Sequence, residues 1–283
     1  MIIDFHTHTY PENIAAKAIN RLAVQNNLFN YTSGTVDALS RSQLSAGIDY
    51  SVVLPVATKA SHVRSMNDVA LEMNRNSKQN HLISFAAIHP DCEDADSIID
   101  EIALNKFAGI KLHPMFQETY IDDDRYLRII DKACNNGLLV LIHSGADISF
   151  PDATYSTPEH TKKMLDELGN PPGIILAHMG GLQNWDDVFD LLTGYDVYLD
   201  TSSTIDNLLS YEGKKVSGPF RTPLSHSLFY SLLDAFGADH ILFGSDSPWG
   251  GQKESLVTLN SIGLDERDLR LIRGENAARL LHL

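Results

Sequence analysis

Eight short runs of apolar and β-branched residues recur along the chain, and each is followed by a segment with helix-like spacing. The runs cover residues 1–10, 50–57, 82–90, 107–114, 138–145, 173–181, 197–203 and 240–250. Strands that alternate with helices predict a parallel sheet, and eight such units predict a closed (β/α)8 barrel of the TIM type. The length of 283 residues suits one barrel, and no linker-like stretch interrupts the chain. We therefore expect an α/β fold with a single TIM-barrel domain over residues 1–283.

The charge balance restricts the partners of this chain. Its formal net charge is −15 and its pI is near 5.1, and the sequence contains no cluster of Lys and Arg. Nucleic acids and anionic membranes are bound through such clusters, so the composition argues against both. Cys92 and Cys134 form no C-x-x-C pair, and we identify neither a signal peptide nor an apolar segment of membrane-spanning length. These features predict a cytoplasmic protein that acts on a small molecule, and they leave homo-oligomerisation open.

The first strand carries an H-x-H motif. Because strand side chains alternate between faces, Asp4, His6 and His8 share one face, and Ile3 and Phe5 share the other. We interpret the polar face as the inner one, lining a site, and the apolar face as the outer one, packed on helices. Two imidazoles on one face can bind a metal ion, although two solvated histidines near a terminus would give the same pattern.

Polar residues also fall where other strands end, which is where barrel enzymes place their catalytic groups. Residues that share a strand face, which we expect to point inward, are Leu141 with His143, Leu176 with His178, and Leu242 with Asp246. Three imidazoles and one carboxylate suit one divalent ion and leave a position for water. Zn²⁺ is the expected ion, with Mn²⁺, Fe²⁺, Co²⁺ and Ni²⁺ as alternatives. The expected ligands are His6, His8, His143 and Asp246, with His178 nearby as a base or electrophile.

Four motifs together resemble the amidohydrolase superfamily. They are "DFHTH" on strand one, "LLVLIHSG" on strand five, "ILAHMGG" on strand six and "ILFGSDSPWG" on strand eight. The similarity is greatest to the branch of aminocarboxymuconate-semialdehyde decarboxylase-like enzymes, and the closing "GENAARLL" also resembles that branch. The resemblance implies a metal-dependent enzyme of the TIM-barrel hydrolase type with a single metal ion. It also implies that His6, His8, His143 and Asp246 are the ligands and that His178 is catalytic.

Four further residues are candidates for substrate binding, each with a structural alternative. Lys111 is either a carboxylated bridge between two metal ions, as in some amidohydrolases, or a buried cation that binds substrate or pairs with a carboxylate; we expect it unmodified, beside one metal. His113 either touches substrate or is a hydrogen-bonded loop residue. Arg221, the single arginine of residues 204–224, either binds a substrate carboxylate or is solvated. Trp249 either forms a pocket wall or packs the barrel rim.

Three functions fit this set of residues. The main expectation is a hydrolase that attacks a small amide, ester or lactone with metal-activated water, with Asp246 as the proton carrier. The alternative is a decarboxylase of an aromatic or muconate-type acid. Fold and ligand set do not separate these two reactions. A metal-binding barrel without catalysis is a third possibility, against which the presence of both His178 and Asp246 argues.

Overall fold

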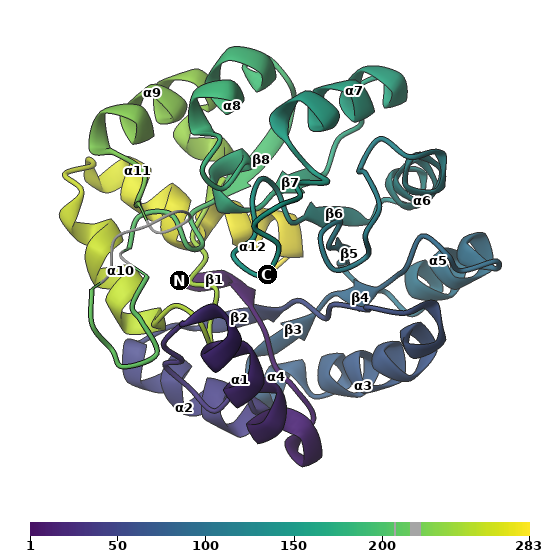
Figure 1. Ribbon diagram of the computed structural model, residues 1–283, viewed down its shortest axis with the longest axis horizontal. Coiled ribbons are helices and arrows are strands. Elements are labelled where there is room, and N and C mark those ends of the chain that lie inside the picture. Colours follow the sequence, from purple (N-terminus) through teal and green to yellow (C-terminus); the bar gives the residue numbers. More distant parts are fainter. Residues whose placement is uncertain (207, 216–221) are drawn as a thin grey trace.

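A computed structural model of the protein describes residues 1–206, 208–215 and 222–283. Parallel strands form a central ring, and helices surround it (Figure 1). The strands are β1 (Ile3–Thr7), β2 (Tyr50–Val53), β3 (Leu82–Ser84), β4 (Ala86–Ala87), β5 (Gly109–Leu112), β6 (Leu139–Ile142), β7 (Ile174–Leu176), β8 (Val197–Asp200) and β9 (Ile241–Leu242). All paired strands run parallel, so the strand ends converge on one rim of the ring.

The ring closes in spite of two interruptions in strand pairing. β3 and β4 are parts of one barrel strand, divided at Phe85, whose N–H donates to the carbonyl of Val53 at 2.9 Å. At the other junction, the N–H of Phe5 in β1 donates to the carbonyl of Phe243 at 2.8 Å, and Thr7 forms a parallel bridge with Ser247. The described residues therefore form eight barrel strands, and the predicted TIM-barrel fold is confirmed.

The helices begin and end at residues that the sequence marks. Thr157 caps α7 by accepting a hydrogen bond from the N–H of His160, and Pro158 occupies the first helical position. Gly137 follows α6 with a left-handed φ of 72°. The helices are α1 (Glu12–Asn26), α2 (Val36–Ala46), α3 (Val63–Arg75), α4 (Ser77–Asn80), α5 (Ala95–Leu104), α6 (Asp124–Asn135), α7 (Pro158–Leu168), α8 (Trp185–Leu192), α9 (His226–Phe236), α10 (Gln252–Ser261), α11 (Glu266–Arg270) and α12 (Asn276–Leu281), with short helical turns at η1 (Ala60–His62), η2 (His178–Gly180), η3 (Ala238–His240) and η4 (Leu271–Glu275).

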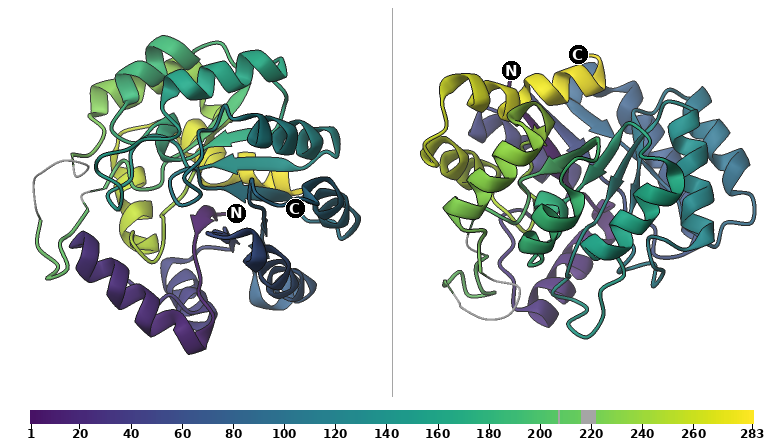
Figure 2. Two further views of the ribbon diagram at one scale, coloured as in Figure 1. Left: turned by 45° about the vertical axis from the view of Figure 1, so that its right-hand side comes forward. Right: turned by 90° about the horizontal axis from the view of Figure 1, so that it is seen from above.

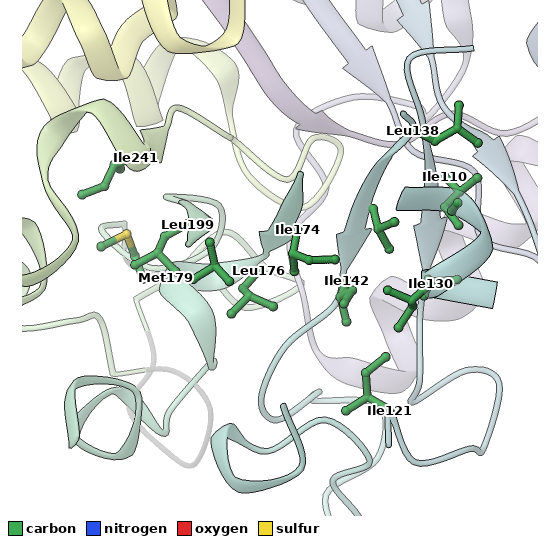
Figure 3. Packing of buried hydrophobic residues seen from close by; sticks show 14 of the residues in the cluster. Ile110, Ile121, Ile130, Leu138, Ile142, Ile174, Leu176, Met179, Leu199 and Ile241 are labelled. Atoms are coloured by element: carbon green, nitrogen blue, oxygen red, sulfur yellow. The ribbon is translucent and has the colours of Figure 1, made fainter. Parts of the chain in front are cut away.

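Among the described residues, two large hydrophobic cores hold these layers together, and a small third cluster consists of Leu39, Val53, Met73 and Leu82. The outer core lies between strands and helices, and Figure 3 shows Ile110, Ile142 and Ile174 of successive strands close to Ile130 of α6. Each of these side chains is fully buried, which stabilises the fold by roughly 1.5–3 kcal/mol per side chain. The inner core fills the barrel. Its members are Ile3, Phe5, Val52, Leu54, Phe85, Leu139, Leu141, Ile175, Ala177, Leu242 and Ala277.

The inner core corrects the predicted faces of two strands. Ile3 and Phe5 point into the barrel, where Phe5 meets Phe85 with ring centroids 5.8 Å apart, so their predicted outward orientation is wrong. Leu176 belongs to the outer core instead of the predicted inner face. The predicted inward orientation of Leu141 and Leu242 is confirmed.

Both chain termini lie at the end of the barrel where the strands begin, and α1 lies at the other end (Figure 2). The carboxyl ends of the strands thus open beneath α1 and the loops that follow the strands. None of the helices in the described part of the chain is long and apolar enough to cross a membrane.

Candidate metal centre and its pocket

A cavity of about 220 Å³ opens at the carboxyl ends of the strands. It is smaller than the roughly 300–1,000 Å³ of sites for drug-sized ligands, so it suits a small molecule. Polar side chains from β1, β5, β6, β7 and β9 or the loops that follow them line it: His6, His8, His113, His143, Asp147, His178 and Asp246. Apolar side chains form much of the remaining wall: Leu22, Leu28, Val56, Phe116, Ile148, Leu182, Leu208 and Trp249.

His6, His8 and Asp246 form the first cluster, in which one donor atom of each residue lies within 4.8 Å of the others. Nε2 of His8 lies 3.3 Å from Oδ1 of Asp246, and Nε2 of His6 lies 3.7 Å from the same oxygen. Ligand atoms of a tetrahedral zinc site with bonds of ~2.1 Å lie about 3.4 Å apart. The spacing of the first cluster therefore fits a bound divalent ion.

The positions of the ring protons of His6 and His8 also favour a cation in the first cluster. Nδ1 of His6 donates to Oδ2 of Asp200, and Nδ1 of His8 donates to the carbonyl of Leu54, both at 2.8 Å. These oxygens can only accept, so each neutral ring carries its proton on Nδ1 and presents a lone pair at Nε2. Both lone pairs thus face the carboxylate of Asp246, and a cation between them satisfies all three groups.

A β-bulge places His6 in the cavity. Asp4 pairs with Ser51 and Thr7 with Val53, so β1 has one residue more than β2 between these points. The extra residue shifts the alternation of side chains, which is how Phe5 can fill the barrel while His6 enters the site. Asp4 faces away from the site and accepts hydrogen bonds from Ser245 and from Gln252 of α10. Burial raises the pKa of Asp4 to about 6, against the opposing effect of these hydrogen bonds.

The two carboxylates of the site have pKa values below the ordinary 3.8 and are therefore ionised. Burial by itself raises the pKa of Asp246 and of Asp200. Positive charge on the neighbouring histidines, on His8 and His6 for Asp246 and on His6 for Asp200, acts in the opposite direction and is the larger effect. Ser203 adds a hydrogen bond to Oδ2 of Asp246 at 2.6 Å. Conversely, burial lowers the pKa of His6 to about 4, so this imidazole is neutral at physiological pH.

His178 reaches the cavity through a left-handed backbone and not through strand alternation. Its φ is 59°, it follows the inward-facing Ala177, and Asp246, which follows β9 two strands away, has a similar φ of 63°. Nδ1 of His178 lies 2.9 Å from the carbonyl oxygen of Ser202. The backbone N–H of His178 donates to Oδ1 of Asp200 at 3.0 Å. Left-handed conformations are uncommon for residues other than glycine and cluster at functional sites.

His143 lies beside His178 and not within the first cluster. Its Nδ1 is 3.0 Å from Nε2 of His178, and its ring is stacked on His113 with centroids 4.2 Å apart. The prediction that His143 is the fourth ligand remains a prediction, as do the other assigned ligand and catalytic roles. Burial, together with neighbouring His113, His178 and Lys111, keeps the pKa of His143 well below 6.5.

The predicted substrate-binding residues lie in different surroundings. Lys111 in β5 is buried beneath the histidines, and its Nζ has no hydrogen-bond partner among the described residues. Burial lowers its pKa to about 8, while Asp200 and Asp246 act in the opposite direction. His113 and Trp249 line the cavity, whereas Arg221 lies outside the described residues.

Sequence reasoning missed Asp147, Asp200 and Ser202. Asp200 ends β8, so the rule that located the other strand-end residues could have found it. Asp147 follows β6 in an irregular loop, where no periodic pattern indicates which way a side chain points. It is buried, and its Oδ1 accepts a hydrogen bond from the N–H of Ser149 at 2.7 Å.

The chain matches the amidohydrolase sequence family over residues 3–283. The chain belongs to the amidohydrolase family. The superfamily predicted from the four motifs is thereby confirmed. A search of curated protein sequences finds no match for this amidohydrolase.

Solved structures share the fold of this amidohydrolase over its length. A 5-carboxyvanillate decarboxylase from Sphingomonas paucimobilis is 14% identical with a TM-score of 0.69, covering 100% of this chain and 99% of that one. A dihydroxybenzoic acid decarboxylase from a Polaromonas species, with bound manganese and the inhibitor 2-nitroresorcinol, is 16% identical with a TM-score of 0.69, covering 100% and 97%. A candidate 2-pyrone-4,6-dicarboxylic acid hydrolase from Pseudomonas putida is 16% identical with a TM-score of 0.68, covering 99% and 97%.

Proposed function

We propose that this amidohydrolase is a metal-dependent, non-oxidative decarboxylase of a small aromatic carboxylic acid. The observation that carries the proposal is the contrast within one small cavity between an apolar wall and a cluster of metal-binding groups. An aromatic acid has the same two-sided character, because its ring is apolar and its carboxylate is a metal ligand. The original main expectation, a hydrolase, becomes the second candidate.

The wall provides suitable surroundings for a ring. Phe116 and Trp249 supply aromatic faces, and Leu22 and Leu28 cover the cavity from α1 and the segment that follows it. Aromatic pairs in offset or edge-to-face contact are worth about 0.5–1.5 kcal/mol beyond the burial of their area. The full-length similarity to solved decarboxylases of substituted aromatic acids supports this substrate class.

The first cluster would hold the metal ion, with His143 as the predicted further ligand. Nitrogen and carboxylate donors suit Zn²⁺, Mn²⁺ or a neighbouring divalent ion, and the spacing of the first cluster fits such an ion. A bound divalent ion would supply Lewis-acid polarisation of a substrate oxygen. The described residues then have to orient the ring, exclude water and move a proton.

The proton movement follows from the balance of the reaction. Breaking the bond between ring carbon and carboxyl carbon releases CO₂ and leaves the electron pair on the ring carbon, so one proton must be delivered to that carbon. Asp246 and His178 line the cavity and can each hold a proton. Asp200 holds the backbone of His178, and Ser202 holds its Nδ1, which fixes the direction of the other ring nitrogen. We propose Asp246 as the proton carrier and His178 as the group that stabilises charge developing on the substrate.

Release of CO₂ from metal-loaded protein tests the proposal. Purified protein with Mn²⁺ or Zn²⁺ is incubated with hydroxybenzoates, carboxyvanillate-type acids, esters, lactones and N-acyl compounds. We expect CO₂ from at least one aromatic acid, and loss of that activity in Asp246→Asn. Hydrolysis of an ester, lactone or amide without CO₂ release would favour the hydrolase. Metal binding with no turnover of any compound would favour the barrel without catalysis.

A further inference from the structure

A carboxylate outside the first cluster borders the cavity. Asp147 follows β6 and lines the cavity, although only 8% of its surface is exposed. Ring contacts lead from His6 to His178, with centroids 5.2 Å apart, and from His178 to His143, at 4.7 Å. Asp147 is a further neighbour of His143, and its Oδ2 lies 3.9 Å from Nε2 of that ring. The carboxylate of Asp147 therefore belongs to the part of the wall beside the metal centre.

The hydrogen bonds to Asp147 leave it able to accept more. Its Oδ1 accepts from the N–H of Ser149 at 2.7 Å, and the side chain of Ser149 also lowers the pKa of this carboxyl group, against the larger effect of burial. Its Oδ2 lies 3.8 Å from Nε2 of His113, which is beyond hydrogen-bonding distance, as is the 3.9 Å to His143. A carboxylate can accept about four hydrogen bonds, so Asp147 has room for a donor on a bound molecule.

The loop that carries Asp147 is tied to the helix that covers the cavity. Oγ of Ser149 accepts a hydrogen bond from Nδ2 of Asn26, the last residue of α1, at 2.7 Å. Asn26 and Ser149 line the cavity together with Asp147, so the three residues form one polar edge of it. A few polar groups that are held in place on a mostly apolar wall fix the orientation and the identity of a ligand.

The charge of the wall narrows the ligands that this edge can accept. Among the described residues that line the cavity, none is a lysine or an arginine, and the buried Lys111 is not one of them. A ligand with a second carboxylate would bring like charge against Asp147 without a fixed cation from these residues to balance it. A hydroxyl or amino group at the same place would instead donate to Asp147. Specificity of this kind combines an attraction with a repulsion.

We propose that Asp147 selects aromatic monocarboxylic acids that carry a hydroxyl or amino group, by accepting a hydrogen bond from that group, and that it rejects acids with a second carboxylate. The proposal rests on the proposed function, since it takes the first carboxylate of the acid as the group bound at the metal centre. The similar solved structures do not make this choice, because they include both a dihydroxybenzoic acid decarboxylase and a candidate 2-pyrone-4,6-dicarboxylic acid hydrolase.

Calorimetry with the Mn²⁺-loaded, full-length protein tests the proposal. The ligands are benzoate, the isomers of hydroxybenzoate and aminobenzoate, and the benzenedicarboxylates with the second group at the matching positions. We expect at least one hydroxy or amino acid to bind about 10-fold or more tightly than benzoate, and the matching dicarboxylate to bind more weakly than benzoate. CO₂ release is measured on the same samples, so selective binding without CO₂ would contradict the proposed decarboxylase and leave this proposal standing.

A matched pair of variants assigns the selection to Asp147. Asp147→Asn should weaken the preferred acid about 10- to 100-fold, the range for a hydrogen bond to a charged group, with little change for benzoate. The dicarboxylate should bind more tightly to this variant than to the wild type, because the like charge is removed. Asp152→Asn, at an exposed carboxylate on the same loop, should leave all affinities unchanged. If Asp147→Asn does not fold by circular dichroism, Asp147→Ser takes its place, with the same expected loss.

Three results would overturn this proposal alone. An equal loss of benzoate and of the hydroxy or amino acid in Asp147→Asn would show that Asp147 supports the cavity and does not read the substituent. Loss of the bound metal from that variant, measured by elemental analysis, would make Asp147 a metal ligand. Tighter binding of the dicarboxylate to the wild type would mean that Asp147 donates a proton instead of accepting one. If none of the acids binds, the proposed substrate class fails as well.

Discussion

Two groups of side chains in the cavity contain two histidines and one aspartate each: the first cluster, and His113, His143 and Asp147, here called the second cluster. They differ in how those side chains are held. In the first cluster, a hydrogen bond from a different part of the chain fixes every ligand, since Asp200 holds His6, Leu54 holds His8 and Ser203 holds Asp246. In the second cluster, His143 is hydrogen-bonded to His178, and Asp147 accepts a hydrogen bond from Ser149. The contact from the N–H of Phe116 to Nδ1 of His113 is long, at 3.4 Å.

This difference shows that donor type alone does not make a strong metal site. Ligands that are already oriented lose little freedom when a metal binds, and the partner of the outer nitrogen fixes the proton of the imidazole. We therefore expect the first cluster, and not the second, to decide whether the protein retains a metal ion through purification.

The largest expected effect is loss of the purified metal. Elemental analysis of the wild type should find about one divalent ion per chain, as expected of a single tight site. His6→Ala and His8→Ala should each remove it, whereas His113→Ala should retain it. Metal content that is unchanged in the first two variants, or lost in the third, would reverse the ranking of the clusters.

The next largest effect is on turnover, measured with the substrate that the screen identifies. Asp246→Asn should lower turnover by at least ~10², the lower end for a general acid–base group, with metal partly retained because asparagine is nearly isosteric. His178→Asn should lower turnover comparably with the metal content intact. Loss of metal in His178→Asn would make His178 a ligand and join the two clusters into one site. Full activity in Asp246→Asn would move the proton transfer to another group.

A smaller effect is expected from the support of the first cluster. Asp200→Asn removes the carboxylate that fixes Nδ1 of His6, and the affinity of the first site for Co²⁺ should fall about 10- to 100-fold. An unchanged affinity would show that the hydrogen bond from His6 to Asp200 does not support the site. Circular dichroism and thermal unfolding would reveal a variant that disturbs the whole cavity.

The sequence located all three residues of the first cluster but not the way in which they are presented. Strand alternation with convergent strand ends was enough to select His6, His8, His143, His178 and Asp246. It failed for the orientation of Ile3 and Phe5, because one extra residue in β1 shifts the alternation. It failed again for Leu176, which was expected to share a face with His178. The left-handed backbone at His178, and not strand alternation, brings the side chain of His178 into the site.

The second cluster was harder to predict because it depends on a loop. His113 follows β5, and its position at the strand end was visible in the sequence. Asp147, however, is oriented by a turn in which its Oδ1 accepts from the N–H of Ser149. Such a turn has no periodic signature, and only the three-dimensional path of the chain brings Asp147 against His113 and His143. A sequence pattern therefore predicts groups on regular strands better than groups on the loops between them.

The smallest expected effect is a pH dependence of stability that belongs to the second cluster. Burial, together with Lys111 and the neighbouring histidines, keeps the pKa of His113 well below 6.5 in the folded protein. In the unfolded chain a histidine titrates near 6.5. As pH falls through this value, the unfolded state binds a proton that the folded state does not, so His113 makes the unfolding free energy fall by at most about 1.4 kcal/mol per pH unit.

His113→Gln removes this contribution, which is present above the unfolded pKa and lost as pH falls below it. The difference in unfolding free energy between the metal-free wild type and His113→Gln should therefore narrow as the pH is lowered from about 7.5 to about 5.5. Urea unfolding at each pH measures it, and His62→Gln, at an exposed histidine, gives the baseline for losing an imidazole. A difference that stays constant with pH would mean that His113 accepts a proton in the folded protein as readily as in the unfolded chain. Burial would then not keep the ring of His113 neutral, and the second cluster would differ from the first in the charge of its histidines as well as in their support.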